Sequence, residues 1–159
     1  MDFRIGTGYD VHRLTLGYPL FIGGIKIPFE KGSEGHSDGD VLIHAVCDAL
    51  LGAVNERDIG CHFPDSDPSL KGVDSKVLLA KTMEIVRSKG YECNNIDSVV
   101  ILETPKLKGY IDKMQEVMAE VMNIDKVKVS VKATTSERLG FTGRGEGVAA
   151  TASVLVYKK

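Results

Sequence analysis

The last apolar segment of the chain, Val148 to Tyr157, limits the possible folds more than any other feature of the sequence. A strand here would place one apolar set on its first face: Val148, Ala150, Ala152, Val154 and Val156. Its second face is also largely apolar, with Ala149, Thr151 and Leu155. An antiparallel strand that is apolar on both faces needs cover on both. We therefore predict helices on one face of the sheet and a subunit interface on the other.

The bulk composition favours one soluble globular domain over residues 1–159. The chain is 43% hydrophobic and 26% charged, and its net charge of −2 argues against a surface that binds nucleic acid. No run approaches the length of a membrane span, and the N-terminus lacks the pattern of a signal peptide. The 3 cysteines are odd in number and far apart, which indicates reduced thiols and a cytoplasmic location.

The hydrophobic pattern predicts an α+β fold, a two-layer sandwich of a mixed β-sheet with helices packed on one face. We expect strands in residues 3–9, 96–103, 127–131 and 148–157, and a hairpin in residues 20–28 around Gly23-Gly24. We expect helices that begin at Ser37 or Asp38, at Asp74-Ser75 and at Ile111. Residues 30–35 and 55–74 are expected to be loops, with Val77 and the helical methionines turned into the core.

A possible metal centre begins with Asp10 and His12, two residues apart on a predicted strand, so that both side chains project from one face. His44 lies in the first predicted helix, which would dock beside the end of that strand. One carboxylate and two imidazoles suit zinc, and three protein ligands leave a fourth position for substrate. Against this, lone histidines are usually surface or hydrogen-bonded core residues, and His62 in the long loop is a rival ligand.

Two aspartates flank His44 by one helical turn, and their role stays open at this point. Asp40 and Asp48 would either orient the His44 ring or act as a helix cap and a surface charge.

Two further segments suggest phosphate or nucleotide binding. Thr134-Thr135-Ser136-Glu137 offers hydroxyls for phosphate and a carboxylate for a hard cation, although a plain turn with a helix cap explains the same residues. The segment 104–108 would line a nucleobase pocket or form an ordinary basic loop. The glycine-rich segment 140–147 lacks the spacing of a phosphate-binding loop, and its Arg144 would pair with an anion or with Glu146.

The sequence also lacks the motifs of nucleophilic and metalloprotease catalysis. No Ser-His-Asp or Cys-His constellation occurs at recognisable spacing, and no His-Glu-x-x-His is present. A metal with an open position beside phosphate-holding loops favours phosphoryl chemistry that depends on positioning and charge stabilisation.

In its motifs, the chain resembles the family of 2-C-methyl-D-erythritol 2,4-cyclodiphosphate synthases of the non-mevalonate isoprenoid pathway. The resemblance runs almost end to end and rests on six motifs in order: Asp10-Val11-His12, His36-Ser37-Asp38-Gly39-Asp40 with His44, Asp58-Ile59-Gly60, Phe63 to Pro68, Lys132 to Glu137, and Gly140 to Gly147. It implies a homotrimer whose sheets face inward and whose active sites lie between subunits. It also implies a reaction in which 4-diphosphocytidyl-2-C-methyl-D-erythritol 2-phosphate cyclises and releases CMP.

The resemblance assigns roles to individual residues. It implies one zinc ion per active site, bound by Asp10, His12 and His44, and a second cation, Mg²⁺ or Mn²⁺, bound by Glu137. It implies that His36 and Thr135 stabilise the transition state. The substrate-binding set that it implies is Asp10, Val11, His12, His36, Ser37, Asp58, Ile59, Gly60, Phe63, Pro64, Asp65, Ser66, Asp67, Leu102, Glu103, Thr104, Pro105, Lys106, Leu107, Lys108, Thr134, Thr135, Ser136, Glu137, Phe141 and Arg144.

Within that set, residues 58–60 and 63–67 would hold the methylerythritol end, and residues 102–108 with Thr134 of the neighbouring subunit would take the cytidine diphosphate part. The base-contacting residues are the most individual in composition, and Cys61 has no assigned role. Two other functions remain to be distinguished: a zinc-dependent phosphodiesterase and a non-catalytic nucleotide-binding trimer. The apolar last strand also motivates the hypothesis that the central channel of the trimer binds a regulatory isoprenoid diphosphate.

Overall fold

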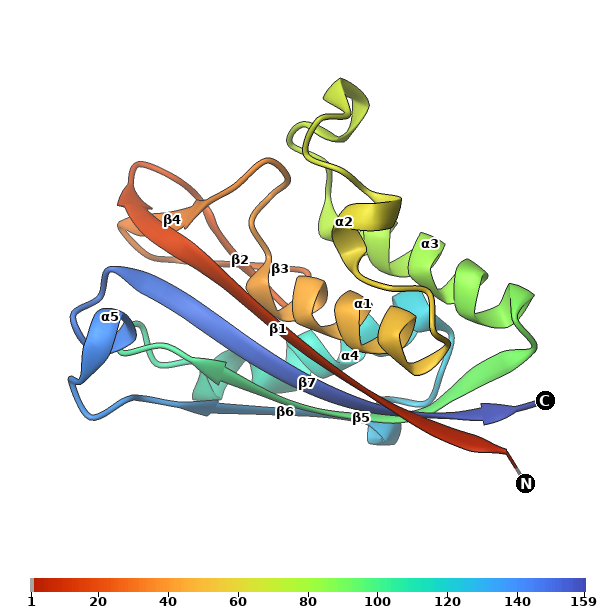
Figure 1. The fold of residues 1–159 in the computed structure, drawn as a ribbon. Coiled ribbons are helices and arrows are strands. Elements are labelled where there is room, and N and C mark those ends of the chain that lie inside the picture. Colours follow the sequence, from red (N-terminus) through yellow and green to blue (C-terminus); the bar gives the residue numbers. More distant parts are fainter. Residues whose placement is uncertain (1) are drawn as a thin grey trace.

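The computed structural model describes residues 2–159 as one mixed β-sheet with helices on one of its faces (Figure 1). The sheet has the strand order β4-β1-β7-β5-β6, in which β5 and β6 are parallel and the other neighbours antiparallel. These strands are β1 (Phe3–Leu16), β4 (Lys31–Glu34), β5 (Tyr91–Ile101), β6 (Val129–Thr134) and β7 (Gly147–Lys158). A separate hairpin comprises β2 (Leu20–Ile22) and β3 (Ile25–Ile27). The predicted α+β class and mixed sheet are confirmed.

Three longer helices cover the sheet: α1 (Val41–Ala53), α3 (Ser75–Ser88) and α4 (Ile111–Met122). Figure 1 shows α1 directly above β1, and α3 packs beside α1 and also contacts β5. The predicted methionine core is confirmed, since Met114, Met118 and Met122 of α4 are fully buried. Shorter helical turns complete the chain: α2 (Ile59–His62), η1 (Pro68–Leu70), η2 (Lys108–Tyr110), η3 (Lys126–Lys128) and α5 (Gly140–Gly143).

The helix-facing side of β1 allows an unusually close approach by α1. A Cβ atom added to Gly8 would lie 1.9 Å from the Ala45 carbonyl oxygen, and one added to Gly6 would lie 1.9 Å from that of Ala49. No side chain fits in either gap, so helix backbone rests on strand backbone. Because side chains alternate along a strand, Asp10 and His12 continue the face that the two glycines begin.

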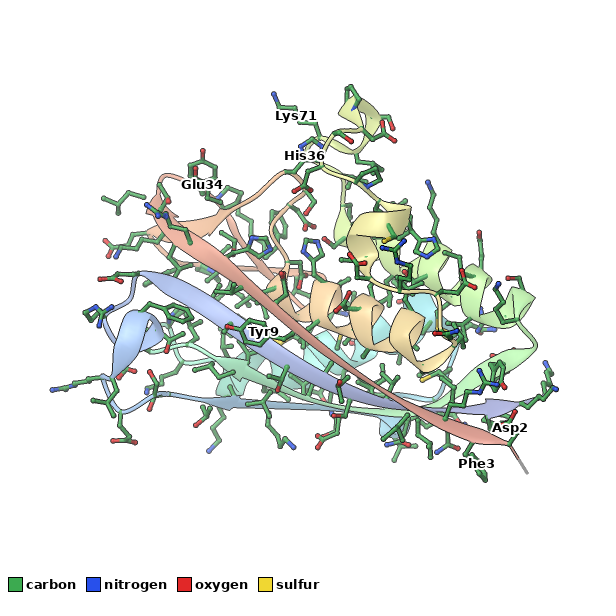
Figure 2. All side chains as sticks on the ribbon, viewed as in Figure 1. Asp2, Phe3, Tyr9, Glu34, His36 and Lys71 are labelled. Atoms are coloured by element: carbon green, nitrogen blue, oxygen red, sulfur yellow. The ribbon has the colours of Figure 1, made fainter. Side chains whose placement is uncertain are left out.

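The opposite face of the sheet is partly apolar and uncovered in the single chain. Phe3, Ile5, Tyr9 and Val11 of β1 point outward and are 49%, 77%, 56% and 43% exposed. Figure 2 shows Phe3 on the side of the sheet away from the helices. On β7, the predicted inner set from Val148 to Val156 is buried. The sheet therefore has one covered apolar face, as predicted, and a second face whose apolar side chains on β1 are exposed in the single chain.

Helix α1 begins later than predicted. Its N-cap is Asp40, whose carboxylate accepts hydrogen bonds from the backbone N–H of Ile43, at 3.0 Å, and of Gly23 and Gly24 in the β2–β3 turn. The prediction of a start at Ser37 or Asp38 is wrong, because the preceding residues adopt non-helical backbone and Asp40 satisfies the first free N–H groups. Gly23 and Gly24 both have positive φ, so the predicted hairpin is confirmed.

Other expectations need correction. Residues 30–35 are not simply a loop, since Lys31 to Glu34 form β4 on the sheet edge, and the long loop of residues 55–74 contains α2 and η1. The strand expected at residues 127–131 begins at Val129, and Val127 is 91% exposed in a helical turn. The strand expected at residues 96–103 spans 91–101. Val77 is exposed rather than in the core.

Candidate metal centre and adjoining cavities

Asp10, His12 and His44 converge where the second half of β1 lies under the first turn of α1. Their candidate ligand atoms all lie within 4.8 Å of one another. The Asp10 Oδ2 atom is 2.9 Å from Nε2 of His12 and 3.2 Å from Nδ1 of His44, and those two nitrogens are 3.3 Å apart. The three side chains are between 12% and 27% exposed. The predicted convergence of one carboxylate and two imidazoles is therefore present in the structure.

The ring nitrogens that face away from this point have partners of their own. Nδ1 of His12 is 3.2 Å from the backbone carbonyl oxygen of Glu34, on β4. Nε2 of His44 is 2.9 Å from Ser75 Oγ and 3.0 Å from Ser37 Oγ. Such outer contacts fix ring orientation in metal-binding histidines.

The aspartates expected beside His44 act elsewhere. Asp40 caps α1, so the cap alternative is confirmed for that residue, and Asp48 accepts a hydrogen bond from the Ile59 N–H. The contacts that orient the His44 ring come instead from Ser37 and Ser75, which the sequence reasoning did not assign to this role.

The mutual contacts of the cluster shift its pKa values. Burial alone would raise the pKa of Asp10, but hydrogen bonds with the two histidines and their charge lower it to about 2. Burial alone would lower the pKa of His12, but the hydrogen bond and charge of Asp10 outweigh it and raise that pKa above its usual value. The site thus holds an ionised carboxylate against two imidazoles at neutral pH.

The donor set fits a zinc ion. One carboxylate oxygen and two imidazole nitrogens are common zinc ligands, and fewer than four protein ligands is typical of catalytic zinc. The Glu34 carbonyl can accept only from an Nδ1–H of His12, which leaves the His12 Nε2 lone pair directed at the cluster. The rival ligand His62 lies outside the cluster, and its Nε2 is 2.7 Å from the Glu56 carbonyl oxygen.

A cleft of about 620 Å³ opens beside the cluster and collects most of the residues predicted for phosphate and the methylerythritol end. Its lining includes Asp10, His12, His36, Ser37, His44, Asp58, Ile59, Gly60, Phe63, Pro64, Asp65 and Ser66. Asp67 does not line it, but its carbonyl oxygen lies 3.0 Å from His36 Nε2. The Gly72 N–H also donates to the His36 carbonyl, and Figure 2 shows His36 next to the loop that carries Lys71. His36 thus ties the loop of residues 64–72 to the cleft.

A second cavity, of about 350 Å³, lies between β6 and the start of α4. Its lining includes most of the residues predicted for the nucleotide: Leu102, Pro105, Lys106, Leu107, Lys108, Thr134 and Thr135. It shares no lining residue with the cleft at the metal cluster. A single chain therefore carries two separate cavities, each lined by a different part of the predicted substrate-binding set.

The remaining predicted residues lie outside both of these cavities. Val11, Phe141 and Arg144 line a third cavity of about 480 Å³, and Glu103 and Thr104 line a fourth with Arg144. Arg144 pairs with Glu146 at 2.9 Å, which confirms that alternative for it.

Ser136 and Glu137 line none of these four cavities. The turn expected at residues 134–137 is present, with the Glu137 N–H donating to Thr135 Oγ1 and Glu137 at a φ of 54°. The expected helix cap is not, because α5 has Leu139 at its N-cap position and no side chain caps it.

Comparisons with known proteins agree with the family that the sequence motifs indicate. A model of the YgbB family matches residues 3–157. The chain is 60% identical to the 2-C-methyl-D-erythritol 2,4-cyclodiphosphate synthase of Porphyromonas gingivalis over 97% of this chain and 95% of that protein. It is 56% identical to the enzyme of the same name from Bacteroides fragilis over 99% of both chains.

Solved structures show the same fold. A complex of IspF from Plasmodium falciparum with CDP has a TM-score of 0.87 at 32% identity and covers 99% of this chain and 97% of that one. The bifunctional IspDF from Campylobacter jejuni has a TM-score of 0.96 at 41% identity, and this chain spans 43% of its length. Within residues 2–159, no helix combines the length and apolar character needed to cross a membrane.

Proposed function

The chain belongs to the YgbB family, and from this premise we propose that the cleft at the metal cluster and the cavity between β6 and α4 are two half-sites that carry out the family's reaction. The protein is an enzyme of the non-mevalonate isoprenoid pathway. It converts 4-diphosphocytidyl-2-C-methyl-D-erythritol 2-phosphate to 2-C-methyl-D-erythritol 2,4-cyclodiphosphate and CMP. One observation supports the cleft at the metal cluster as the place of the reaction: beside it converge Asp10, His12 and His44.

Asp10, His12 and His44 would hold one zinc ion per active site, and Glu137 would hold Mg²⁺ or Mn²⁺ on the substrate diphosphate. When bound, the two cations supply Lewis acidity and neutralise charge on the reacting phosphates. The ionised state of Asp10 supports its role as a ligand, because its pKa of about 2 leaves it charged at neutral pH.

The cleft would bind the phosphorylated methylerythritol end. His36 and Ser37 offer an imidazole and a hydroxyl to phosphate oxygens, and residues 58–60 and 63–67 would enclose the sugar alcohol. The contact between His36 and the Asp67 carbonyl supports this role for the loop, since one residue touches both the loop and the cleft. His36 and Thr135 would stabilise the charge that develops in the transition state.

The cavity lined by Leu102, residues 105–108, Thr134 and Thr135 would bind the cytidine diphosphate part, and it would do so for the cleft of a neighbouring subunit in a homotrimer. Three observations support this proposal. The two cavities of one chain share no residue, the outer face of the sheet exposes Ile5 and Tyr9, and two similar structures are described as bound to CDP.

Further proposals follow from that assembly. The outer sheet faces would surround a central channel, with Phe141 and Arg144 near its end, and an isoprenoid diphosphate is the ligand that we propose for it. We also propose that residues 1–159 act as one domain in the cytoplasm, which three free cysteines support.

The reaction itself is an intramolecular displacement. An oxygen of the 2-phosphate attacks the β-phosphorus, the bond from that phosphorus to the bridging oxygen breaks, and CMP leaves with that oxygen. Both reacting groups are anionic, so bringing them together is the main obstacle. Correct orientation of two groups within one molecule can lower such a barrier by up to roughly 7–11 kcal/mol. The contact of His36 with Asp67 would hold the loop of residues 64–72 against the cleft. The loop would then exclude water, which otherwise competes as the nucleophile.

A turnover assay with the cytidylated substrate tests this function. We expect mass spectrometry to detect the cyclic diphosphate and CMP with the native protein, and we expect both to disappear after removal of metal by a chelator and to return with added Zn²⁺ and Mg²⁺. The variant His44→Ala should lose both products, and its matched control His62→Ala should still form them, because His62 lies outside the metal cluster and the cleft lining. A linear phosphate product would instead indicate a phosphodiesterase and contradict the proposed cyclisation.

A further inference from the structure

We propose that Asp38 and Ser75 are positioning residues for His44: they hold its ring so that Nδ1 is available to the metal. This inference rests on the proposed metal site. It concerns residues that the sequence analysis did not assign to the site. Neither Asp38 nor Ser75 lines the cleft, so both would act through His44.

The first step is the bond between Asp38 and Ser75. Ser75 is the first residue of α3 and is completely buried. One oxygen of the Asp38 carboxylate accepts the Ser75 backbone N–H at 2.9 Å, and the other accepts the Ser75 hydroxyl. A carboxylate only accepts hydrogen bonds, so the Ser75 hydroxyl proton is committed to Asp38.

The second step is the contact of Ser75 with His44. Because its proton points to Asp38, Ser75 Oγ can offer only lone pairs to His44 Nε2, which is 2.9 Å away. A hydrogen bond then forms only if His44 carries its proton on Nε2. The neutral ring has one N–H, so Nδ1 keeps its lone pair, and Nδ1 is the atom that faces Asp10. The chain Asp38–Ser75–His44 therefore selects the tautomer that a metal ligand needs.

The third step concerns Ser37, whose Oγ is 3.0 Å from the same nitrogen. Since Nε2 carries a proton, Ser37 cannot donate to it. The Ser37 hydroxyl proton is then available to a phosphate oxygen of a substrate bound in the cleft that Ser37 lines. The partly buried Asp38 carboxylate thus sets both the metal-binding tautomer of His44 and the donor direction of a proposed phosphate ligand.

The experiment compares Zn²⁺ affinity among metal-stripped variants by competition with a chromophoric chelator. We expect Ser75→Ala to weaken Zn²⁺ binding about 10–100-fold, the usual cost of losing an outer partner of a metal-binding histidine. Ser75→Ala keeps the backbone N–H bond to Asp38, so the unfolding temperature of the metal-free protein should change little. Ser88→Ala, in the last turn of the same helix and exposed, is the matched control and should bind Zn²⁺ as the native protein does.

Ser37→Ala distinguishes the two hydroxyls at Nε2, and we expect it to weaken Zn²⁺ binding less than about threefold, because Ser75 still accepts the proton. An affinity of Ser75→Ala within about twofold of native would overturn the inference, as would equal losses from both substitutions. If the native protein itself fails to bind Zn²⁺, the proposed metal site fails rather than this inference.

A spectroscopic measurement on the native protein makes the test independent of whether Ser75→Ala folds. In the zinc-loaded protein labelled with ¹⁵N-histidine, we expect the Nε2–H proton of His44 to be visible and protected from exchange with water, and to exchange faster in Ser75→Ala. Rapid exchange of this proton in the native protein would show that it has no buried acceptor and would overturn the proposal. The His44→Ala spectrum assigns the signal.

Discussion

A mixed trimer made from two inactive variants should recover activity if each active site combines two subunits. The first variant, His44→Ala, removes a metal ligand from the cleft. The second, Ala133→Trp, places a large ring in the cavity between β6 and α4, which the exposed Ala133 lines. Because the two cavities share no lining residue, each variant leaves the other half-site intact. Each variant alone should form inactive trimers.

The expected magnitude follows from cyclic symmetry. In a closed ring of three subunits, every junction joins the cleft of one subunit to the nucleotide cavity of the next. A ring with both variants, in either ratio, contains one junction at which a native cleft meets a native cavity. Mixed trimers should therefore show about one third of the native activity per trimer, with an unchanged KM.

The assay uses coexpression of the two variants with different affinity tags and two successive purifications, so that only mixed assemblies remain. Turnover is then measured by release of CMP. The control is the same procedure with both tags on His44→Ala, which should give no activity. Recovered mixed assemblies without activity would show that each site lies within one subunit, and failure to recover any mixed assembly would refute the trimer.

Two further predictions test the packing of the chain. Gly8→Ala should lower the free energy of unfolding of the metal-free protein by about 3 kcal/mol, because its methyl group would overlap the backbone of α1. The control Gly52→Ala, on the open side of α1, should raise that free energy by up to about 1 kcal/mol. Urea unfolding measures both, and a loss below about 1 kcal/mol for Gly8→Ala would contradict the close packing. At pH 8 a thiol reagent should label Cys61 alone in the native protein and all three cysteines in denaturant. The reason is that burial raises the pKa of Cys47 and of Cys93 to about 12, whereas Cys61 is exposed. Labelling of more than one thiol in the native protein would refute the burial of Cys47 and Cys93.

The features that the sequence predicted well are those that depend on local period. Alternation along β1 placed Asp10 and His12 on one face, and two consecutive glycines placed the hairpin turn at Gly23 and Gly24. Strand β4 could not be predicted in this way. Its residues, Lys31 to Glu34, carry no apolar alternation, and they form a strand because β1 extends past the hairpin and offers an edge for pairing.

The outer contacts of the metal site were missed for a different reason. Asp38 and Ser75 are 37 residues apart and meet only because the loop before α1 packs against the first turn of α3. Helical spacing suggested Asp40 and Asp48 as partners of His44, but the free N–H groups at Gly24 and Ile59 bind those carboxylates instead. A pattern within one helix cannot show which backbone donors another segment will present.

The packing of β1 against α1 explains why the metal site lies where it does. A zinc ligand on a helix must come within a few ångströms of ligands on a strand, whereas a layer of side chains usually separates the backbone of a helix from that of a sheet. Gly6 and Gly8 remove that layer, and Asp10 and His12 follow on the same face where α1 begins. Short side chains in the first half of the strand therefore bring His44 within reach of ligands in the second half. Gly8→Ala should therefore also weaken Zn²⁺ binding, although Gly8 has no side chain to act as a ligand, because the added methyl group would push the first turns of α1 away from β1.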